Sequence, residues 1–410
     1  MRALLTTFLI VISFVATAQW TALPATQNAY QTLAVPSDNH VFWAPMSKDI
    51  YYSHNGGASW QAFQTGYEYE FFEDMDFVND SVGFICGGGW FTQHRNLILR
   101  TTDAGQSWHT LTRDSLGAAQ FLFSKIDFVN IDSGVVATSY GEELFRTLNG
   151  GVTWQAISPD TLNGYNLSDV YFYNGGLGFL TTTGNSNPSW NAKIYRTTDF
   201  GLSWQVVKEW DDQHSFYKIH FTDAQNGFVG GSNGRLFRTT DGGTTWTETV
   251  ANPGNNITAL WATSPGAIYS NVLGTVYQTT NAGAMWNPQL MTPSAIATEI
   301  QFSPSGQTGF LIGGTQIYKT TNGGGPTAVT DPTLQAQIKI FPNPASGVVQ
   351  LEYPVGVTVQ NLQLLDVSGR IIRVFEKGTK VLNVAGCVPG TYFLHVQTSS
   401  GSLNEKIAIR

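Results

Sequence analysis

Hydrophobic and polar residues alternate in short runs along most of the chain, and the runs recur in groups of four. In one clear group, residues 73–79 alternate, residues 81–87 are mostly apolar, and residues 97–101 and 108–111 complete the set. Alternation with a period of two predicts β-strands that bury one face. Equivalent first strands begin near Ile126, Val170, Ile219, Leu260 and Ile300. The body of the chain is therefore predicted to be all-β and built from four-stranded units.

A ten-residue motif recurs between the third and fourth strands of the groups. In the copy at residues 99–108, LRTTDAGQSW, the fifth residue is acidic, the seventh is glycine and the tenth is tryptophan. Asp or Asn side chains hold tight turns through nearby backbone amides, and glycine permits a positive φ. We expect the tryptophan to pack between units with its indole N–H hydrogen-bonded. The Asp or Asn and Trp positions are Asn55, Trp60, Asp103, Trp108, Asn149, Trp154, Asp199, Trp204, Asp241, Trp246, Asn281, Trp286 and Asn322.

The intact tryptophans recur every 40 to 50 residues, a period typical of β-propeller blades. The motif resembles the Asp-box, or bacterial neuraminidase repeat, found in sialidases, sortilin-type receptors and propellers like the photosystem II assembly factor. The resemblance covers residues 19–325 and implies a seven-bladed β-propeller. Arginines at the second motif position, Arg100, Arg146, Arg196 and Arg238, are predicted to be structural because they belong to the repeat.

The seventh motif is incomplete, and the start of the chain offers the missing piece. Pro326 and Thr327 stand where Ser or Thr and Trp should be, whereas Trp20 begins a segment that matches the fourth-strand pattern. We predict that residues 19–23 complete the last blade and close the ring, which removes an open sheet edge.

The first eighteen residues have the features of a signal peptide. Arg2 precedes an apolar run at residues 3–16, and Ala16-Thr17-Ala18 fits a cleavage site. The apolar run is shorter than the roughly 20 residues that a bilayer requires, so no transmembrane segment is expected. We expect export with a mature chain that begins at Gln19. Cys86 and Cys387 lie in different predicted domains and are expected to be buried free thiols.

A linker at residues 326–337 leads to a tail at residues 338–410, whose short alternating strands predict a small Ig-like β-sandwich. The tail resembles the type A C-terminal sorting domain of Bacteroidetes type nine secretion cargo. The matching segments are Phe341-Pro-Asn-Pro344, residues 365–370, 389–393 and 406–410. The resemblance implies a partnership with the type nine secretion machinery, followed by tail removal with release or surface attachment. The alternative is a carbohydrate-binding or adhesive module.

Composition and charge narrow the function classes. Charged residues make up 12% and aromatic residues 13%, which argues against a disordered chain. The formal net charge is -8, and the propeller region holds 13 basic and 24 acidic residues, whereas the tail holds seven and four. The excess of acidic residues in the propeller region argues against nucleic-acid binding, which requires clustered basic residues. The acids between residues 68 and 76 are expected to charge the rim of the ring.

Irregular insertions mark the candidate ligand face. In a propeller, the loops after the second and fourth strands emerge opposite the Asp-box turns, and here they carry aromatic residues beside hydrogen-bonding ones. The alternative is that each aromatic residue packs only its own loop. The candidates are Tyr67, Glu70, Trp90, His94, Arg95, Trp190, Trp210, Asp211 and His214.

The same face carries no convincing catalytic set. A sialidase needs three convergent arginines, and in the propeller region only Arg95, Arg113 and Arg235 lie outside the repeated motif. Glu70 with Asp211 or Asp212 could in principle serve a glycoside hydrolase, which needs two carboxylates a few ångströms apart. Asp211, Asp212 and His214 fall short of a structural zinc set. We therefore predict a secreted monomer that binds a glycan or protein, with no cofactor, metal or catalytic residue; a sialidase-like or endoglucanase-like hydrolase is the alternative.

Overall fold

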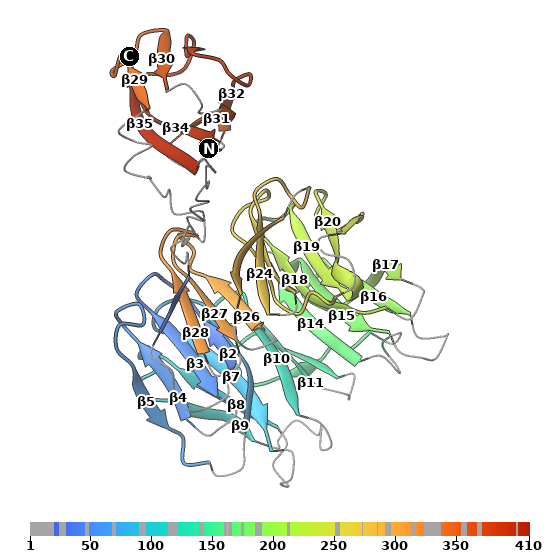
Figure 1. Ribbon diagram of the computed structural model, residues 1–410. Coiled ribbons are helices and arrows are strands. Elements are labelled where there is room, and N and C mark those ends of the chain that lie inside the picture. Colours follow the sequence, from blue (N-terminus) through green and yellow to red (C-terminus); the bar gives the residue numbers. More distant parts are fainter. Residues whose placement is uncertain are drawn as a thin grey trace, which may run out of the picture. The chain divides into compact units, whose positions relative to one another are not determined.

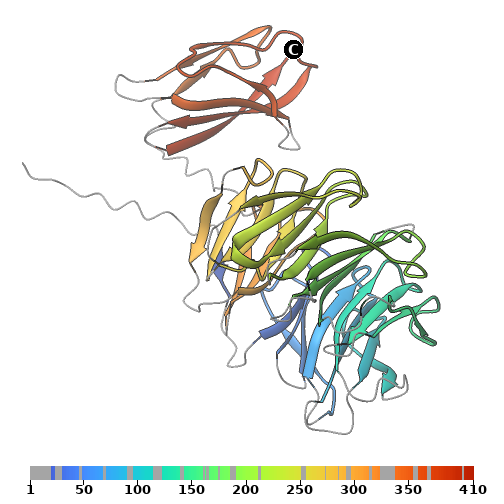
Figure 2. The ribbon, with the colours of Figure 1, turned by 90° about the vertical axis from the view of Figure 1, so that its right-hand side faces the viewer.

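The regular structure of the chain is almost entirely β-strand, and it falls into two compact units, residues 18–325 and residues 326–410. Figures 1 and 2 show the strands of the two units. The computed structural model describes residues 20–23, 30–45, 49–67, 71–89, 96–113, 122–138, 143–159, 162, 166–173, 176–184, 191–210, 214–250, 255–272, 274–284, 286–291, 297–313, 316–323, 338–353, 359–366, 371–398 and 401–410.

The described residues of the first unit form seven four-stranded antiparallel sheets, six of which consist of four strands in chain order. The six are β2 (Tyr30–Ala34), β3 (Val41–Pro45), β4 (Asp49–Ser53), β5 (Gln61–Gln64); β6 (Phe71–Phe77), β7 (Gly83–Gly88), β8 (Leu97–Thr101), β9 (His109–Arg113); β10 (Phe123–Phe128), β11 (Gly134–Thr138), β12 (Leu144–Thr147), β13 (Gln155–Ala156); β14 (Asn166–Phe172), β15 (Gly178–Thr183), β16 (Ala192–Thr197), β17 (Gln205–Trp210); β18 (Phe216–Phe221), β19 (Gly227–Gly231), β20 (Arg235–Thr239), β21 (Thr247–Val250); and β22 (Leu260–Ala262), β23 (Ile268–Val272), β24 (Thr275–Thr279), β25 (Asn287–Met291). The predicted four-stranded units are thus present.

The seventh sheet joins the two ends of this unit. It orders β26 (Ala297–Phe302), β27 (Gly309–Gly313) and β28 (Gln316–Thr320), and β28 pairs with β1 (Thr21–Ala22). Thr21 lies opposite Lys319, and Trp20, just before the strand, is only 1% exposed. The Trp20 ring meets Tyr269 and Phe302 edge-on. The N-terminal segment is therefore held to the last sheet by backbone pairing and by side-chain packing.

The first strands of neighbouring sheets lie beside one another in cyclic order. Contacts link β2 with β6, β6 with β10, β10 with β14, β14 with β18, β18 with β22, β22 with β26, and β26 with β2. The remaining strands of each sheet follow outward from these inner strands (Figure 1). Side chains on the inner strands therefore share one central region.

Stacked phenylalanines join neighbouring sheets. The last residue of several inner strands is a phenylalanine that stacks on an aromatic ring of the preceding sheet. Phe77 stacks on Phe42 with ring centroids 3.7 Å apart, and Phe128 stacks on Phe84 at 3.5 Å. Aromatic pairs of this kind contribute about 0.5–1.5 kcal/mol beyond the area they bury.

Each of these phenylalanines also covers a glycine and meets a motif tryptophan. A Cβ added to Gly134, the first residue of β11, would lie 2.4 Å from the Phe128 ring, and Trp154 meets that ring edge-on at 6.1 Å. The same glycine recurs at the start of other second strands, as Gly83, Gly178, Gly227 and Gly309. A further repeat, Phe followed six or seven residues later by Gly, was therefore missed by the sequence analysis.

The Asp-box turns are held by a side-chain hydrogen-bond network. Asp103 Oδ1 accepts the backbone N–H of Ser107 at 2.9 Å, and Thr101 Oγ1 accepts the N–H of Gly105, whose φ is +79°. The buried Thr101 also donates to Asp103 at 2.9 Å, a role that the sequence analysis did not identify. The threonine or serine recurs as Ser53, Thr147, Thr197, Thr239, Thr279 and Thr320.

The motif arginines link neighbouring sheets, which confirms a structural role for three of them. Arg100 donates to Gly150 O at 3.4 Å, Arg146 to Phe200 O at 3.2 Å and Arg196 to Gly242 O at 2.7 Å. Each acceptor lies in the Asp-box turn of the next sheet. Lys319 of the last sheet makes the equivalent bond to Gly56 O of the first, at 2.6 Å.

The expectation that every motif indole N–H finds a partner is only partly right. Trp154 and Trp246 donate to carbonyls three residues earlier, and Trp204 donates to Ile157 O at 3.0 Å. The buried indole nitrogens of Trp108 and Trp286 have no hydrogen-bond partner among the described residues. The expectation is wrong for these two; the Trp108 ring is held by edge-on packing on Phe77, with ring centroids 5.9 Å apart.

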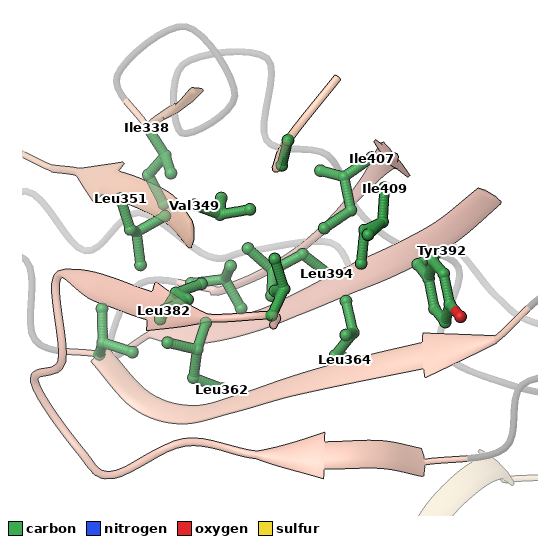
Figure 3. Packing of buried hydrophobic residues seen from close by; sticks show 14 residues of the cluster. Ile338, Val349, Leu351, Leu362, Leu364, Leu382, Tyr392, Leu394, Ile407 and Ile409 are labelled. Carbon is green, nitrogen blue, oxygen red and sulfur yellow. The ribbon is translucent and has the colours of Figure 1, made fainter. Parts of the chain in front are cut away.

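In the part of the second unit that the structure describes, the strands form two sheets. One orders β29 (Lys339–Phe341), β30 (Val348–Glu352) and β33 (Val381–Asn383), and the other orders β32 (Ile371–Val374), β31 (Val359–Asp366), β34 (Gly390–Thr398) and β35 (Gly401–Ile409). Residues from both sheets form one buried core, including Val349, Leu364 and Ile407 (Figure 3). β33 is not predicted from the sequence, because its single buried side chain gives little alternation.

The Phe341-Pro-Asn-Pro344 segment is fastened to the last strand. Asn343 Nδ2 donates to Lys406 O at 2.8 Å, and Asn343 Oδ1 accepts the N–H of Ala408 at 2.9 Å. Of the two free cysteines, Cys86 is buried as expected, but Cys387 is only half-buried, so that expectation is wrong. Cys387 lies in the loop before β34, at the border of the core rather than inside it.

Candidate functional site

Most of the predicted ligand-face residues lie outside the described part of the chain. These are Glu70, Trp90, His94, Arg95, Trp190 and Asp211. The three that are described make internal contacts: Tyr67 OH lies 2.6 Å from Thr110 Oγ1, and Trp210, 9% exposed, stacks on His214 at 4.4 Å. The ring of Trp210 therefore offers a ligand little surface.

A different polar site lies where the inner strands meet. Alternate residues of these strands face a cavity of about 160 Å³, which we call the inner cavity. Its polar and aromatic lining residues are Asp74, Asp76, Asp127, Asp169, Tyr171, Lys218, His220, Trp261, Glu299 and Gln301. Asp74 and Asp76 thus face the centre of the unit rather than its rim, which corrects the expectation for these acids.

The sequence carries a repeated signal for the inner cavity. Polar residues occupy the first and third positions before each repeated phenylalanine, as in Asp74-Met-Asp76-Phe77 and Lys125-Ile-Asp127-Phe128. On a strand these two positions share one face. Only the arrangement of the sheets shows that this face is turned inward, where charge is costly.

Carboxylates of the inner strands accept backbone hydrogen bonds from the next sheet. Asp74 accepts the N–H of Ile126 at 3.0 Å and Asp169 accepts that of Ile219 at 2.9 Å. Glu299 makes the corresponding bond to Leu33 at 3.0 Å. The inner strands of neighbouring sheets belong to different sheets and are not paired through their backbones. The carboxylates therefore accept backbone N–H groups at these junctions. The acids therefore have a structural role.

One end of the inner cavity contains balancing cations. Lys125 Nζ lies 4.0 Å from Asp74 Oδ2. Burial lowers the pKa of Lys125, but Asp74, Asp169 and Glu299 outweigh this effect and raise the pKa above its ordinary value. Lys125 therefore keeps its charge. Burial still raises the pKa of Asp74, and it raises that of Glu299 to about 7, with Lys218 and Lys125 opposing the shift.

The other end of the inner cavity has acids without such balance. Burial, assisted by repulsion from Asp74, raises the pKa of Asp76 to about 7 although Asp76 accepts the N–H of Phe128 at 2.7 Å. Burial and repulsion from Asp76 raise the pKa of Asp127 well above its ordinary value. His220 is no counterion, because burial lowers its pKa to about 4.

A second cavity of about 340 Å³, which we call the mouth cavity, continues from this end. It shares Asp76, His220, Trp261 and Gln301 with the inner cavity. The His220 and Trp261 rings lie 4.1 Å apart, and His220 Nε2 lies 3.0 Å from Ala262 O. The outer lining comes from turns between first and second strands and includes Pro36, Val78, Thr222, Thr263 and Pro304.

The mouth cavity lies at the edge that carries the Asp-box turns. Backbone N–H groups of these turns donate to the turns between first and second strands: Ala104 to Ser81 O at 3.0 Å, and Gly242 to Gln225 O at 3.0 Å. From the sequence, the ligand face is expected at the opposite edge. Cavity and predicted face are therefore separate candidate sites.

Metal-binding clusters and membrane-spanning helices are both absent from the described residues. Within the described ranges, no group of three or more His, Cys, Asp or Glu side chains is placed to hold a metal ion. Nor does any helix in that part of the chain have the length and apolar character needed to cross a membrane.

Two family models match the chain. The model of the Photosynthesis system II assembly factor YCF48 matches residues 12–167 and 166–308, and that of the Secretion system C-terminal sorting domain matches residues 339–410. The Photosystem II assembly lipoprotein Ycf48 of Synechococcus sp. (strain CC9902) is 29% identical over 174 residues, which are 41% of this chain and 49% of that protein. The chain spans about half the length of the curated relatives that it matches.

Solved structures show a similar fold. A structure of YCF48 bound to D1 peptide has a TM-score of 0.59 at 17% identity and covers 75% of this chain and 98% of that chain. The GH74 xyloglucanase from Xanthomonas campestris has a TM-score of 0.60 at 12% identity and covers 93% of this chain and 59% of that chain. Identities this low show a shared propeller fold and not a shared activity.

Proposed function

The chain belongs to the Photosynthesis system II assembly factor YCF48 family, and from this premise we propose that it is a scaffold that binds a protein segment through its propeller. The sorting domain indicates a secreted or cell-surface protein of type IX secretion. The family match over residues 12–308 carries the proposal, and the similarity to a structure described as bound to a peptide supports it.

We propose further that the seven sheets are seven blades of a ring closed by β1. The cyclic contacts of the inner strands, the pairing of Thr21 with Lys319 and the bond from Lys319 to Gly56 O support this closure. A closed ring holds its central cavities in fixed shape, which suits a binding site.

For export, we propose removal of residues 1–18 and recognition of residues 338–410 by the type IX machinery. The tail unit has its own buried core, and Asn343 fixes the Pro-Asn-Pro turn to the last strand, as a separately recognised domain requires. We propose that the mature protein is a monomer, which light scattering of the purified protein would check.

The glycoside-hydrolase alternative has less support. The xyloglucanase neighbour shares the fold at 12% identity, and the proposed pair, Glu70 with Asp211, lies outside the described residues. The inner-strand acids Asp74, Asp76 and Asp169 bond to neighbouring sheets, so they already have a structural role.

One experiment separates the two functions. The mature chain, residues 19–410, would be probed with an array of twelve-residue peptides and incubated with xyloglucan and sialyllactose. We expect binding to a subset of peptides and no release of reducing sugar or sialic acid. Cleavage of either glycan together with the absence of peptide binding would overturn the proposed function in favour of the hydrolase.

A further inference from the structure

We propose that the mouth cavity receives a cationic side chain, an arginine guanidinium or a lysine ammonium, from the bound protein segment. The inference rests on the proposed function and specifies the ligand chemistry of one site in it. It concerns the edge that carries the Asp-box turns, not the insertion-loop face expected from sequence.

Size and shape fit such a side chain. The mouth cavity measures about 340 Å³, within the range of about 300–1,000 Å³ typical of ligand sites. Its outer part is lined by Pro36, Val78 and Pro304, and its inner part by Asp76 and Gln301. Arginine and lysine side chains match this lining, because each has an apolar stem that ends in a charged group.

The charge at the inner end selects a cation. Asp76 and Asp127 lie on adjacent inner strands, and among the described groups that shift their pKa values none is a cation. At the opposite end of the inner cavity, Asp74 already has a counterion, because Lys125 Nζ lies 4.0 Å from its Oδ2. A buried carboxylate is stabilised strongly by a partner of opposite charge, whereas an anionic ligand here would be repelled.

Asp76 has hydrogen-bonding capacity to spare. Its carboxylate accepts the backbone N–H groups of Phe128 and Phe77, and a carboxylate offers about four acceptor positions. A guanidinium presents five donors in a planar fork and pairs well with a carboxylate. The structural bonds and a ligand bond can therefore coexist on one side chain.

An aromatic wall supplies the second element of recognition. Trp261 is half-buried and borders both cavities, and its ring lies against the neutral His220. A cation over a tryptophan face is attracted by the negative face of the ring, and more strongly the further it is desolvated. Because His220 stays uncharged at pH 7, it does not compete with the ligand for Asp76.

Proton release follows from the same arrangement. The pKa of Asp76 is about 7, so part of the population carries a proton at neutral pH. A bound cation favours the carboxylate form and expels that proton. Affinity should therefore rise between pH 6 and pH 8, opposite to the behaviour expected if protonated His220 bound an anion.

The test uses two peptides that differ in one charge. Mature protein, residues 19–410, would be titrated calorimetrically with acetyl-Gly-Arg-Gly-amide and with its citrulline counterpart, in buffers of different ionisation enthalpy. We expect the arginine peptide to bind at least tenfold more tightly and to release protons. Equal binding of the two peptides would refute the proposal.

Variants locate the site. Asp76→Asn keeps an oxygen for the Phe128 N–H and should weaken arginine binding at least tenfold, whereas Asp132→Asn, an exposed acid in a turn at the same edge, should change it less than twofold. Should Asp76→Asn fail to fold, Thr263→Glu adds an acid at the mouth and should strengthen binding. Equal losses in the two Asn variants, or no gain with Thr263→Glu, would contradict the assignment.

The peptide array distinguishes failure of this inference from failure of the proposed function. If array peptides bind without any preference for arginine or lysine, the cationic site is refuted while the scaffold function stands. If no array peptide binds and neither short peptide does, both are refuted.

Discussion

Replacing Gly134 with alanine tests the packing that joins the sheets. The added Cβ would lie 2.4 Å from the Phe128 ring. Phe128 cannot move away easily, because it stacks on Phe84 at 3.5 Å and meets Trp154 at its edge. The backbone at Gly134 is outside the left-handed region, so the penalty is steric and not conformational.

The expected cost has two parts. Forcing an extra carbon into a packed interior costs about 1–3 kcal/mol. Displacing the Phe128 ring from Phe84 forfeits about 0.5–1.5 kcal/mol of ring pairing. We therefore expect Gly134→Ala to lower the free energy of unfolding by about 2–4 kcal/mol.

The assay is urea unfolding followed by tryptophan fluorescence, in a double-mutant cycle with Phe128→Leu. Leucine is smaller and more flexible than phenylalanine, so the cost of Gly134→Ala should fall by at least half in that background. Gly66→Ala is the matched control: no atom lies within 4 Å of its added Cβ, and its φ of +77° should cost only about 1–2 kcal/mol of backbone strain.

Two results would refute the packing argument. One is additivity of the two substitutions, because it would mean that the Cβ and the ring do not compete for space. The other is a cost for Gly134→Ala no greater than that for Gly66→Ala.

Other predictions address protons, closure, turns and the tail. The pKa values of Asp76 and Glu299 are raised to about 7, so the folded state binds extra protons; their contribution to stability is full below pH 4 and is lost as pH rises through 7, and the melting temperature should fall from pH 5 to pH 8. A flat profile would contradict this assignment. Deleting residues 19–24 should lower the melting temperature and solubility, because β28 loses its partner; unchanged values would argue against closure. Asp103→Ala should cost about 1–2 kcal/mol in urea unfolding, whereas Asp103→Asn, which keeps an acceptor, should cost less than half as much. Asn343→Ala should lower secretion in a cell-fractionation assay, because it removes two bonds to the last strand; normal export would count against a role for this turn.

Local patterns predicted much of the fold. Alternation located the strands, although the first pair, expected at residues 73–79 and 81–87, is observed at Phe71–Phe77 and Gly83–Gly88. The shift arises because Asn79 Oδ1 accepts the N–H groups of Ser81 and Val82, each at 2.9 Å, and keeps both residues in the turn. An Asn side chain competes with strand pairing in this way, and alternation alone does not show it.

The candidate site was harder to predict than the scaffold. The aromatic residues of the surface insertions predict a ligand face, yet Trp210 is buried against His214 and Phe237. Asp76 and Trp261, by contrast, come from regular strands and resemble ordinary strand residues. Their importance arises from the meeting of several inner strands, which no single strand reveals.

The sequence by itself determined the strand pattern, the repeated turns, the structural motif arginines and the two-part organisation of the chain, because each depends on residues close together or on a repeating period. Only the tertiary structure decided which polar faces turn inward and which acids lack a counterion. Burial and the charges on adjacent strands set the pKa of Asp76 at about 7 and leave that of Lys125 raised. These properties come from strands far apart in sequence, so the site exists only when the sheets are assembled.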